Sequence, residues 1–224
     1  MISEVVRAHQ ALASAGQTDL IWGHVSVRDP EGRGFWMKTA GWGFAEVNAQ
    51  RVILVSPSGE ILSGTGKCHL EYPIHAEILR CRPDVHCVVH THAMAANAFS
   101  SLDVPLRALS HDGVLFTDPQ IPRFTRTGGL IKTAGLGAEL ANTLGDALAC
   151  LLPRHGLVTA GKDAAHAVMY AVLLERACQV QLSAMAAGGS HSWSDAAEVS
   201  AKRDECWPDS QINAGWDHLI RTFS

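Results

Sequence analysis

The chain has 224 residues, of which 47% are hydrophobic and 18% are charged, and its formal net charge is −4. This length and composition are typical of one large globular domain or two small ones, and they exclude a disordered chain. The negative charge removes the basis for general nucleic-acid binding, and no apolar run reaches the ~18 residues of a membrane span. We therefore expect neither nucleic acid nor membrane as a partner.

The N-terminus and the cysteines favour a cytoplasmic location. Residues 2–16 have the apolar spacing of a helix, but they include Glu4 and Arg7, which interrupt the unbroken apolar stretch of a signal peptide. The six cysteines are scattered and form no CxxC pair. In a chain of this length that pattern is typical of reduced, mostly buried thiols.

Hydrophobic periodicity and turn residues then predict helices and strands in alternation. In chain order we expect strands at 20–28 and 34–39, a hairpin of 53–55 and 60–62, a helix at 70–81, a strand at 85–91, a helix at 93–100, an irregular segment at 103–126, a helix at about 129–144, strands at 147–152 and 156–160, a helix at 163–187, and one or two peripheral helices in 190–224. Several strand pairs are joined by tight turns. This favours a mixed or largely antiparallel sheet with helices on both faces.

His90 and His92 are the strongest local signal among the twelve histidines. They follow an apolar strand, in which side chains two residues apart lie on the same face. A catalytic metal site needs about three protein ligands and an open position, so two imidazoles supply most of one. His155, in a tight turn between two apolar strands, is the best candidate for the third ligand. The alternative is a chance pair of histidines at a strand end.

Glu71 and His75 lie four residues apart, so we expect them on one face of a helix. Glu71 is at the helix start, where the helix dipole favours a carboxylate, and its role could be structural alone. Because it precedes the strand that carries His90 and His92, it could instead be an acid/base group beside a metal.

These motifs follow one another in a specific order. They are Gly23-His24-Val25-Ser26, Glu71 with His75, Arg82-Pro83-Asp84-Val85, His90-Thr91-His92 and His155-Gly156-Leu157. The ordered set resembles the class II aldolase/adducin superfamily over about residues 2–185. The resemblance implies an α/β fold, a three-layer α/β/α sandwich around a mixed, mainly antiparallel sheet. It makes residues 1–224 a single domain, with residues 190–224 as a C-terminal helical extension.

The same resemblance implies a metal enzyme. The family's three metal histidines match His90, His92 and His155, and its catalytic glutamate matches Glu71. It implies one divalent ion per subunit, zinc or manganese, with iron or cobalt as alternatives that suit the same ligands. It also implies a homotetramer with active sites near subunit interfaces. The adducins of this superfamily lack the metal histidines, which argues against a binding module without activity.

The phosphate-binding residues of the sugar-phosphate branch are missing. That branch has Gly-Asn-x-Ser, then Thr-Gly, then Ser-Ser before the glutamate. This chain has Gly23-His24-Val25-Ser26, Ala40-Gly41 and His69-Leu70 in these places. Leucine cannot bind phosphate, and the loss of four hydrogen-bonding partners would leave the anion poorly solvated. We therefore do not expect a phosphorylated sugar as the substrate.

The replacing residues are bulkier and flatter, which suits an aromatic ring. The candidates for the pocket wall are His24, His69, Leu70, Trp36, Trp42, Phe44 and Phe116, several of which could pack the core instead. This pattern resembles the hydroxy-aromatic acid decarboxylases of the family, which include enzymes for 3,4-dihydroxyphthalate.

We therefore expect the non-oxidative decarboxylation of an ortho-hydroxy aromatic acid. Its phenol and carboxylate oxygens would chelate the metal. Glu71, His24 or His69 would deliver the proton to the ring. The alternative is an aldolase or epimerase that acts on a non-phosphorylated hydroxy-carbonyl compound with the same metal chemistry.

Four residues are candidates for substrate binding: Gly41, Lys67, His111 and Arg28. A second carboxylate on the substrate would need a cation, for which Arg28, Lys67, Arg123 and Arg126 are available. Lys67 is favoured because it is near Glu71 in the sequence, although it could simply be solvated. His111 lies in a loop that approaches the site in this family, so it is either a pocket residue or a structural loop histidine.

Overall fold

The computed structural model describes residues 1–189 and 192–223. Within these residues it contains a seven-stranded sheet in the order β4-β3-β2-β1-β5-β7-β6. The strands are β1 (His24–Arg28), β2 (Phe35–Lys38), β3 (Val52–Val55), β4 (Ile61–Ser63), β5 (Cys87–Thr91), β6 (Ala149–Leu152) and β7 (Gly156–Gly161). All neighbouring strands pair antiparallel, while an isolated bridge between Arg123 and Leu151 is parallel. The expected antiparallel character of the sheet is confirmed.

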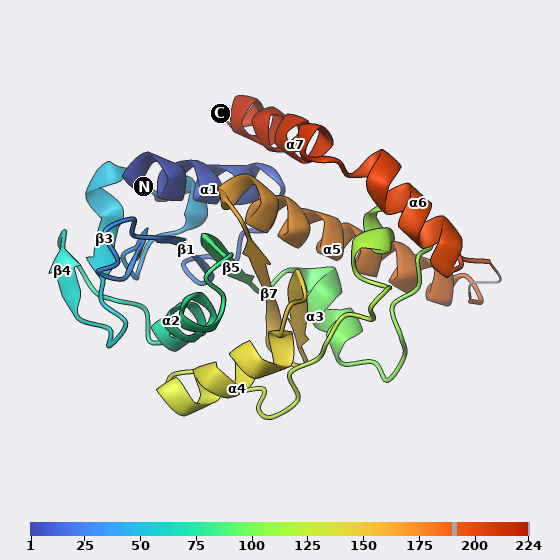
Figure 1. Ribbon diagram of the computed structural model, residues 1–224, viewed down its shortest axis with the longest axis horizontal. Helices are drawn as coiled ribbons and strands as arrows, with labels where there is room; N and C mark the ends of the chain where they lie inside the picture. Colours follow the sequence, from blue (N-terminus) through green and yellow to red (C-terminus); the bar gives the residue numbers. More distant parts are fainter. Residues whose placement is uncertain (190–191, 224) are drawn as a thin grey trace.

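Helices cover both faces of this sheet (Figure 1). They are α1 (Ile2–Ser14), α2 (Tyr72–Cys81), α3 (Met94–Ser100), α4 (Ala134–Leu144), α5 (Ala164–Ala186), α6 (Ala196–Cys206) and α7 (Asp209–Thr222), with short 3-10 helices at Phe44–Glu46, Ala49–Arg51 and His111–Leu115. One core cluster lies between the sheet and α1, α3 and α5, and a second lies between the sheet and α2 and α4. The three-layer α/β/α sandwich is therefore confirmed.

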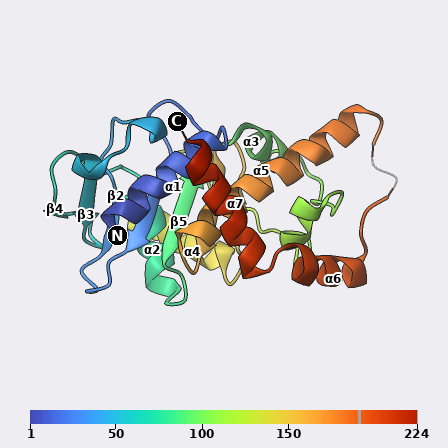
Figure 2. The same ribbon diagram turned by 90° about the horizontal axis from the view of Figure 1, so that it is seen from above.

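Residues 190–224 were expected to form a helical extension. The described part of this segment contains α6 and α7, and residues 190, 191 and 224 lie outside the described residues. Figure 2 shows α7 lying across α1 and α5, and Ile212 and Trp216 of α7 join the core beneath it. Among the described residues, no helix is long and apolar enough to cross a membrane.

The side chains of β1 alternate between the two faces of the sheet. Val25 and Val27 are buried against α1, so the side chains of His24 and Ser26 lie on the α2 face. The antiparallel register pairs His24 with His90 of β5, and His90 in turn pairs with Val158 of β7. The starts of β1 and β7 and the end of β5 therefore lie next to one another at the same end of the sheet.

Two expected boundaries were too early in the chain. The strand expected from residue 20 begins at His24, because Leu20 and Gly23 have φ values of 48° and 73°, outside the extended region. The helix expected from about residue 129 begins at Ala134, because Thr133 caps it by accepting the N–H of Leu136. The residues before Thr133 therefore form a loop, and this loop reaches the site described next.

Candidate metal centre

Four side chains converge at this end of the sheet, where β1 and β7 begin and β5 ends. Glu71, His90, His92 and His155 each offer a ligand atom, and these atoms all lie within 4.8 Å of one another. Glu71 is the residue before α2, His90 and His92 lie at and just beyond the end of β5, and His155 lies in the turn before β7. The structure thus brings together the residues that the sequence identified as metal ligands and catalytic glutamate.

The Nδ1 atoms of His90 and His92 each lie within hydrogen-bond distance of an acceptor. The Nδ1 of His90 lies 2.9 Å from the carbonyl oxygen of Leu157, and the Nδ1 of His92 lies 2.6 Å from a carboxylate oxygen of Asp19. Because these oxygens only accept, each Nδ1 carries a proton, which leaves Nε2 as the atom of each ring that can bind a metal. The two Nε2 atoms face each other at 3.1 Å. A cation between them would relieve the repulsion of the two lone pairs.

His155 is the second sign that these side chains fit a metal. Its side chain is 7% exposed, and neither ring nitrogen has a hydrogen-bond partner among the described residues. Leaving a buried polar atom unpaired costs about 1–3 kcal/mol, which a ligand bond would offset. Three imidazoles and a carboxylate also form a donor set that zinc and other divalent transition metals accept.

A glycine makes this close approach of β7 to β5 feasible. A Cβ atom on Gly156 would lie 2.3 Å from the carbonyl oxygen of Thr91 and 3.0 Å from the His92 ring. Any side chain at position 156 would therefore push His155 away from His90 and His92.

Glu71 is held as a carboxylate at the edge of the histidine cluster. Its Oε1 accepts the N–H of Ile131 at 2.7 Å and lies 3.5 Å from the Nε2 of His155. Burial raises the pKa of Glu71, but the contacts with His155, His90 and the Ile131 N–H outweigh burial and lower it to about 2. Glu71 is thus ionised at neutral pH. The sequence missed Ile131, because the loop that carries it was expected to be helical.

His24 lies beside the cluster and belongs to a buried chain of polar groups. Its ring centroid is 5.0 Å from that of His90. Its Nδ1 lies 2.6 Å from the Nε2 of His75, whose Nδ1 lies 2.6 Å from the Oγ of Ser26. Burial, followed by the neighbouring His69 and His75, lowers the pKa of His24, so its ring is neutral. His75 was expected to share a helix face with Glu71, but the structure directs it to His24.

His69 lies against His24, with ring centroids 4.6 Å apart and ring planes tilted by 54°. On its other side it meets Lys38, whose Nζ lies 3.3 Å from the Nε2 of His69. The Lys38 side chain is fully buried, and burial lowers its pKa to about 8. The sequence did not predict that Lys38 lies beside the site. The available signal was a charged residue at the end of the apolar strand Phe35-Trp36-Met37-Lys38.

Two of the expected substrate-binding residues lie together on neighbouring loops near His69. The N–H of Ala40, which precedes Gly41, donates to the carbonyl oxygen of Lys67 at 2.8 Å, and the hydroxyl of Thr39 also bonds to Lys67. Gly41 and Lys67 are both exposed, so their positions suit contact with a substrate or solvent.

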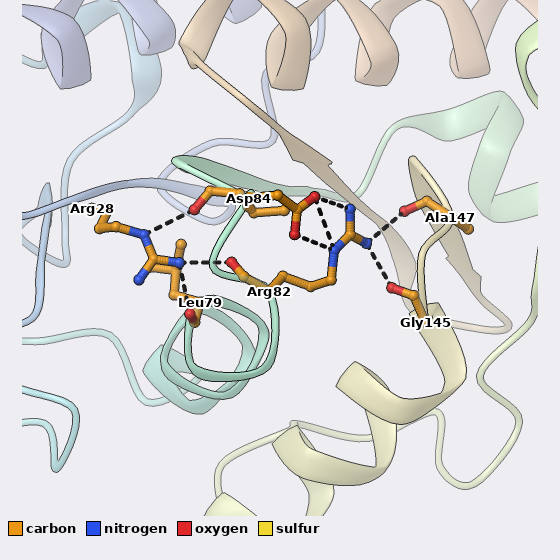
Figure 3. Close-up of polar contacts among 7 residues, drawn as sticks. Arg28, Leu79, Arg82, Asp84, Gly145 and Ala147 are labelled. Atoms are coloured by element: carbon orange, nitrogen blue, oxygen red, sulfur yellow. Dashed lines mark hydrogen bonds and ion pairs between the residues drawn. The ribbon is translucent and has the colours of Figure 1, made fainter.

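The other two candidates are not brought to the histidines. Arg28 lies at the opposite end of β1 from His24, and its guanidinium donates to the carbonyl oxygens of Val85, Leu79 and Arg82 (Figure 3). His111 begins a 3-10 helix that packs against α5 and α6, and its carbonyl accepts the indole N–H of Trp207. In this chain, Arg28 therefore has a structural environment, and His111 lies near the C-terminal helices.

Most of the aromatic candidates for the pocket wall pack elsewhere. Phe44 and Phe116 are buried in the core cluster beneath α1 and α5, the indole N–H of Trp36 donates to Asp29, and Trp42 stacks on Arg51. Leu70, by contrast, is 68% exposed beside Glu71. The side chains that the structure places beside the cluster are therefore histidines and the exposed Leu70.

Comparison with known proteins agrees with this geometry. Residues 3–182 match the family model described as the class II aldolase and adducin N-terminal domain. The chain belongs to this family. Its structure superposes on L-fuculose 1-phosphate aldolase from Glaciozyma antarctica PI12 with a TM-score of 0.87 at 28% sequence identity, covering 99% of this chain and 87% of that one. Family membership confirms the resemblance in the sequence.

Two decarboxylases are among the relatives. The chain is 34% identical over 174 residues to decarboxylase NovR from Streptomyces niveus, which covers 76% of this chain but only 64% of that protein. It is 29% identical over 228 residues to 3,4-dihydroxyphthalate decarboxylase from Terrabacter sp., covering 96% of this chain and 94% of that one. The family thus includes both aldolases and decarboxylases, which are lyases.

Proposed function

We propose that this protein is a metal-dependent decarboxylase of an ortho-hydroxy aromatic acid similar to 3,4-dihydroxyphthalate. The observation that carries the proposal is the convergence of Glu71 with His90, His92 and His155, next to His24 and His69 where sugar-phosphate enzymes of the family have phosphate-binding residues. Decarboxylases at about 30% identity support the same assignment.

In this proposal His90, His92 and His155 hold one divalent ion, with Glu71 beside it. When bound, the ion would supply a Lewis acid that stabilises negative charge on the phenol and carboxylate oxygens of the substrate. Zinc or manganese suits these ligands, and iron or cobalt would also fit. The hydrogen bonds that the Nδ1–H groups of His92 and His90 donate to Asp19 and Leu157 would keep the Nε2 atoms of these rings aimed at the ion.

Glu71 is the proposed proton carrier. As a carboxylate it accepts the proton of the phenol hydroxyl, and it then delivers this proton to the ring carbon that bears the carboxylate. The bond from that carbon to the carboxylate breaks, carbon dioxide leaves, and the electron pair returns to the ring as a phenolate. A proton from solvent restores the phenol. His24 and His69 would flank the substrate, and either is an alternative proton donor.

A second candidate function is an aldolase or epimerase for a non-phosphorylated hydroxy-carbonyl compound. It is favoured by the close structural match to an L-fuculose 1-phosphate aldolase. The residues argue against a phosphorylated substrate, because His24, His69 and Leu70 stand where the phosphate would need small hydroxyl and amide groups.

The deciding experiment is to measure carbon dioxide release from 3,4-dihydroxyphthalate and a panel of ortho-hydroxy aromatic acids, with metal content measured on the same preparation. We expect carbon dioxide and a dihydroxybenzoate from 3,4-dihydroxyphthalate. Failure on every acid, together with cleavage or inversion of a simple hydroxy-carbonyl compound, would favour the aldolase or epimerase.

We further propose that the single domain assembles as a homotetramer with its active sites near subunit interfaces. Large apolar side chains that flank the metal cluster in the sequence are exposed in the single chain: Leu20, Trp22, Leu70, Met94 and Leu130. Subunit contacts would bury such side chains. Light scattering on the purified protein tests this directly, and a monomeric mass would contradict it.

A further inference from the structure

Lys38 is a buried amine with an unusual set of partners. Its side chain has no exposed surface, and among the described residues no carboxylate oxygen lies within 4.0 Å of its Nζ. The Nζ instead lies 3.0 Å from the carbonyl oxygen of Ile21, 2.9 Å from that of Trp42, and 3.3 Å from the Nε2 of His69. A buried lysine without a carboxylate partner is costly, which suggests a role in the site it adjoins.

The donors of Lys38 determine the protonation of the His69 ring. An ammonium group has three N–H donors and no acceptor, while carbonyl oxygens only accept. Two N–H groups go to Ile21 and Trp42, so the third goes to His69 Nε2, which must present a lone pair. A neutral imidazole with its lone pair at Nε2 carries its proton on Nδ1. With a pKa of about 8, Lys38 keeps its ammonium form at neutral pH.

His69 occupies a place where such a donor would meet the substrate. Its ring contacts that of His24, which lies next to the candidate metal ligand His90. It stands in the sequence position from which the sugar-phosphate enzymes use a hydroxyl group to hold an anion. A cation on the far nitrogen polarises the Nδ1–H bond and strengthens its hydrogen bond to an anion.

We propose that Lys38 is a positioning residue that fixes His69 in the Nδ1–H tautomer, so that His69 donates a hydrogen bond to the second carboxylate of an aromatic dicarboxylate substrate and transfers no proton itself. This inference rests on the proposed decarboxylase function and adds to it the group that holds the second carboxylate. His69, polarised by Lys38, takes the role that the sequence suggested for the exposed Lys67.

The tautomer can be tested without turnover. Solid-state ¹⁵N NMR of histidine-labelled protein separates protonated from unprotonated ring nitrogens, and subtraction of the His69→Gln spectrum assigns the His69 signals. We expect a protonated Nδ1 and an unprotonated Nε2 in the wild type. In Lys38→Met the Nε2–H form should grow, because the ammonium donor is gone. A wild-type ring protonated on Nε2, or a tautomer unaffected by Lys38→Met, would overturn the inference.

A matched pair of variants at position 69 tests the role in binding, and it leaves Lys38 in place if Lys38→Met does not fold. The side-chain amide of asparagine reaches the position of Nδ1, whereas that of glutamine reaches the position of Nε2. The probes are phthalate, with two adjacent carboxylates, and benzoate, with one, titrated by calorimetry.

We expect His69→Asn to bind phthalate nearly as the wild type does, and His69→Gln to bind it about tenfold more weakly, as for one hydrogen bond to a charged group. Benzoate affinity should change less in both variants. Equal phthalate affinity in the two variants would overturn the binding role. If these results hold and no aromatic acid is decarboxylated, the proposed function fails and the Lys38–His69 arrangement remains.

Discussion

The polar side chains at the two ends of strand β1 differ in whether other groups of the chain satisfy their hydrogen bonds. At its C-terminal end, the Arg28 guanidinium donates to the carbonyl oxygens of Leu79, Arg82 and Val85 at 2.7–2.9 Å. Beside it, Arg82 forms a bidentate pair with Asp84 and donates to the carbonyl oxygens of Gly145 and Ala147 (Figure 3). These bonds link β1, α2 and the end of α4, so the arginines at this end of β1 stabilise the packing of these elements.

At the N-terminal end of β1, buried polar atoms are left without partners. Neither ring nitrogen of His155 has a hydrogen-bond partner among the described residues, and the Nε2 atoms of His90 and His92 face each other at 3.1 Å. Buried polar groups are normally satisfied, so a cluster of exceptions has to be explained. The comparison teaches that the chain itself satisfies the polar groups at the arginine end, whereas the histidine end presents a donor set that a metal ion would satisfy.

The largest effect should follow from removing a histidine of the cluster. His92→Ala leaves two imidazoles, fewer than the three protein ligands of a catalytic metal site, so we expect loss of the metal and turnover at background level. Metal analysis after dialysis and a carbon dioxide assay measure this. His86→Ala, at the opposite end of β5, is the control and should keep both. Full metal occupancy in His92→Ala would remove His92 from the site.

Glu71→Gln should retain the fold but lose proton transfer. The amide keeps the size of the side chain and an oxygen to accept the Ile131 N–H, yet it cannot carry a proton. We expect turnover to fall about 10²–10⁴-fold with little change in substrate binding. Glu77→Gln, on the same helix and paired with Arg80, is the matched control. Wild-type turnover in Glu71→Gln would make His24 or His69 the leading proton donor.

Arg28→Met tests the arginine end. The substitution removes a charged donor from the carbonyl oxygens of Leu79, Val85 and Arg82, so we expect the free energy of unfolding to fall by about 2–4 kcal/mol. Metal content and substrate affinity should stay at wild-type values. Chemical denaturation and calorimetry measure the two properties separately. Unchanged stability with weaker substrate binding would return Arg28 to the list of substrate-binding residues.

Asp19→Asn should have the smallest effect, on metal affinity alone. Asp19 orients the His92 ring through a 2.6 Å contact, and loss of such a partner typically weakens metal binding about 10–100-fold. Asp163→Asn is the control, because Asp163 holds His166 at 2.7 Å in the same way but away from the cluster. Equal metal affinities in the two variants would show that Asp19 has no role in the site.

Local patterns in the sequence determined the parts of the molecule that depend on neighbouring residues. Alternation and turn residues predicted the strands and their antiparallel pairing, and the His90-Thr91-His92 spacing predicted two imidazoles on one face. Residues 103–126 were expected to be irregular, and apart from a short 3-10 helix at His111–Leu115 they contain no other helix or named strand. These features follow from backbone geometry over a few residues, which a sequence displays directly.

Only the tertiary structure decided which distant residues complete the site. Asp19 orients His92, Ile131 holds Glu71, and Lys38 reaches His69, across separations of 73, 60 and 31 residues. The same holds for the three carbonyl partners of Arg28, which lie 51 to 57 residues away along the chain. Hydrogen bonds between distant residues depend on how strands and loops pack, and no local periodicity records that packing.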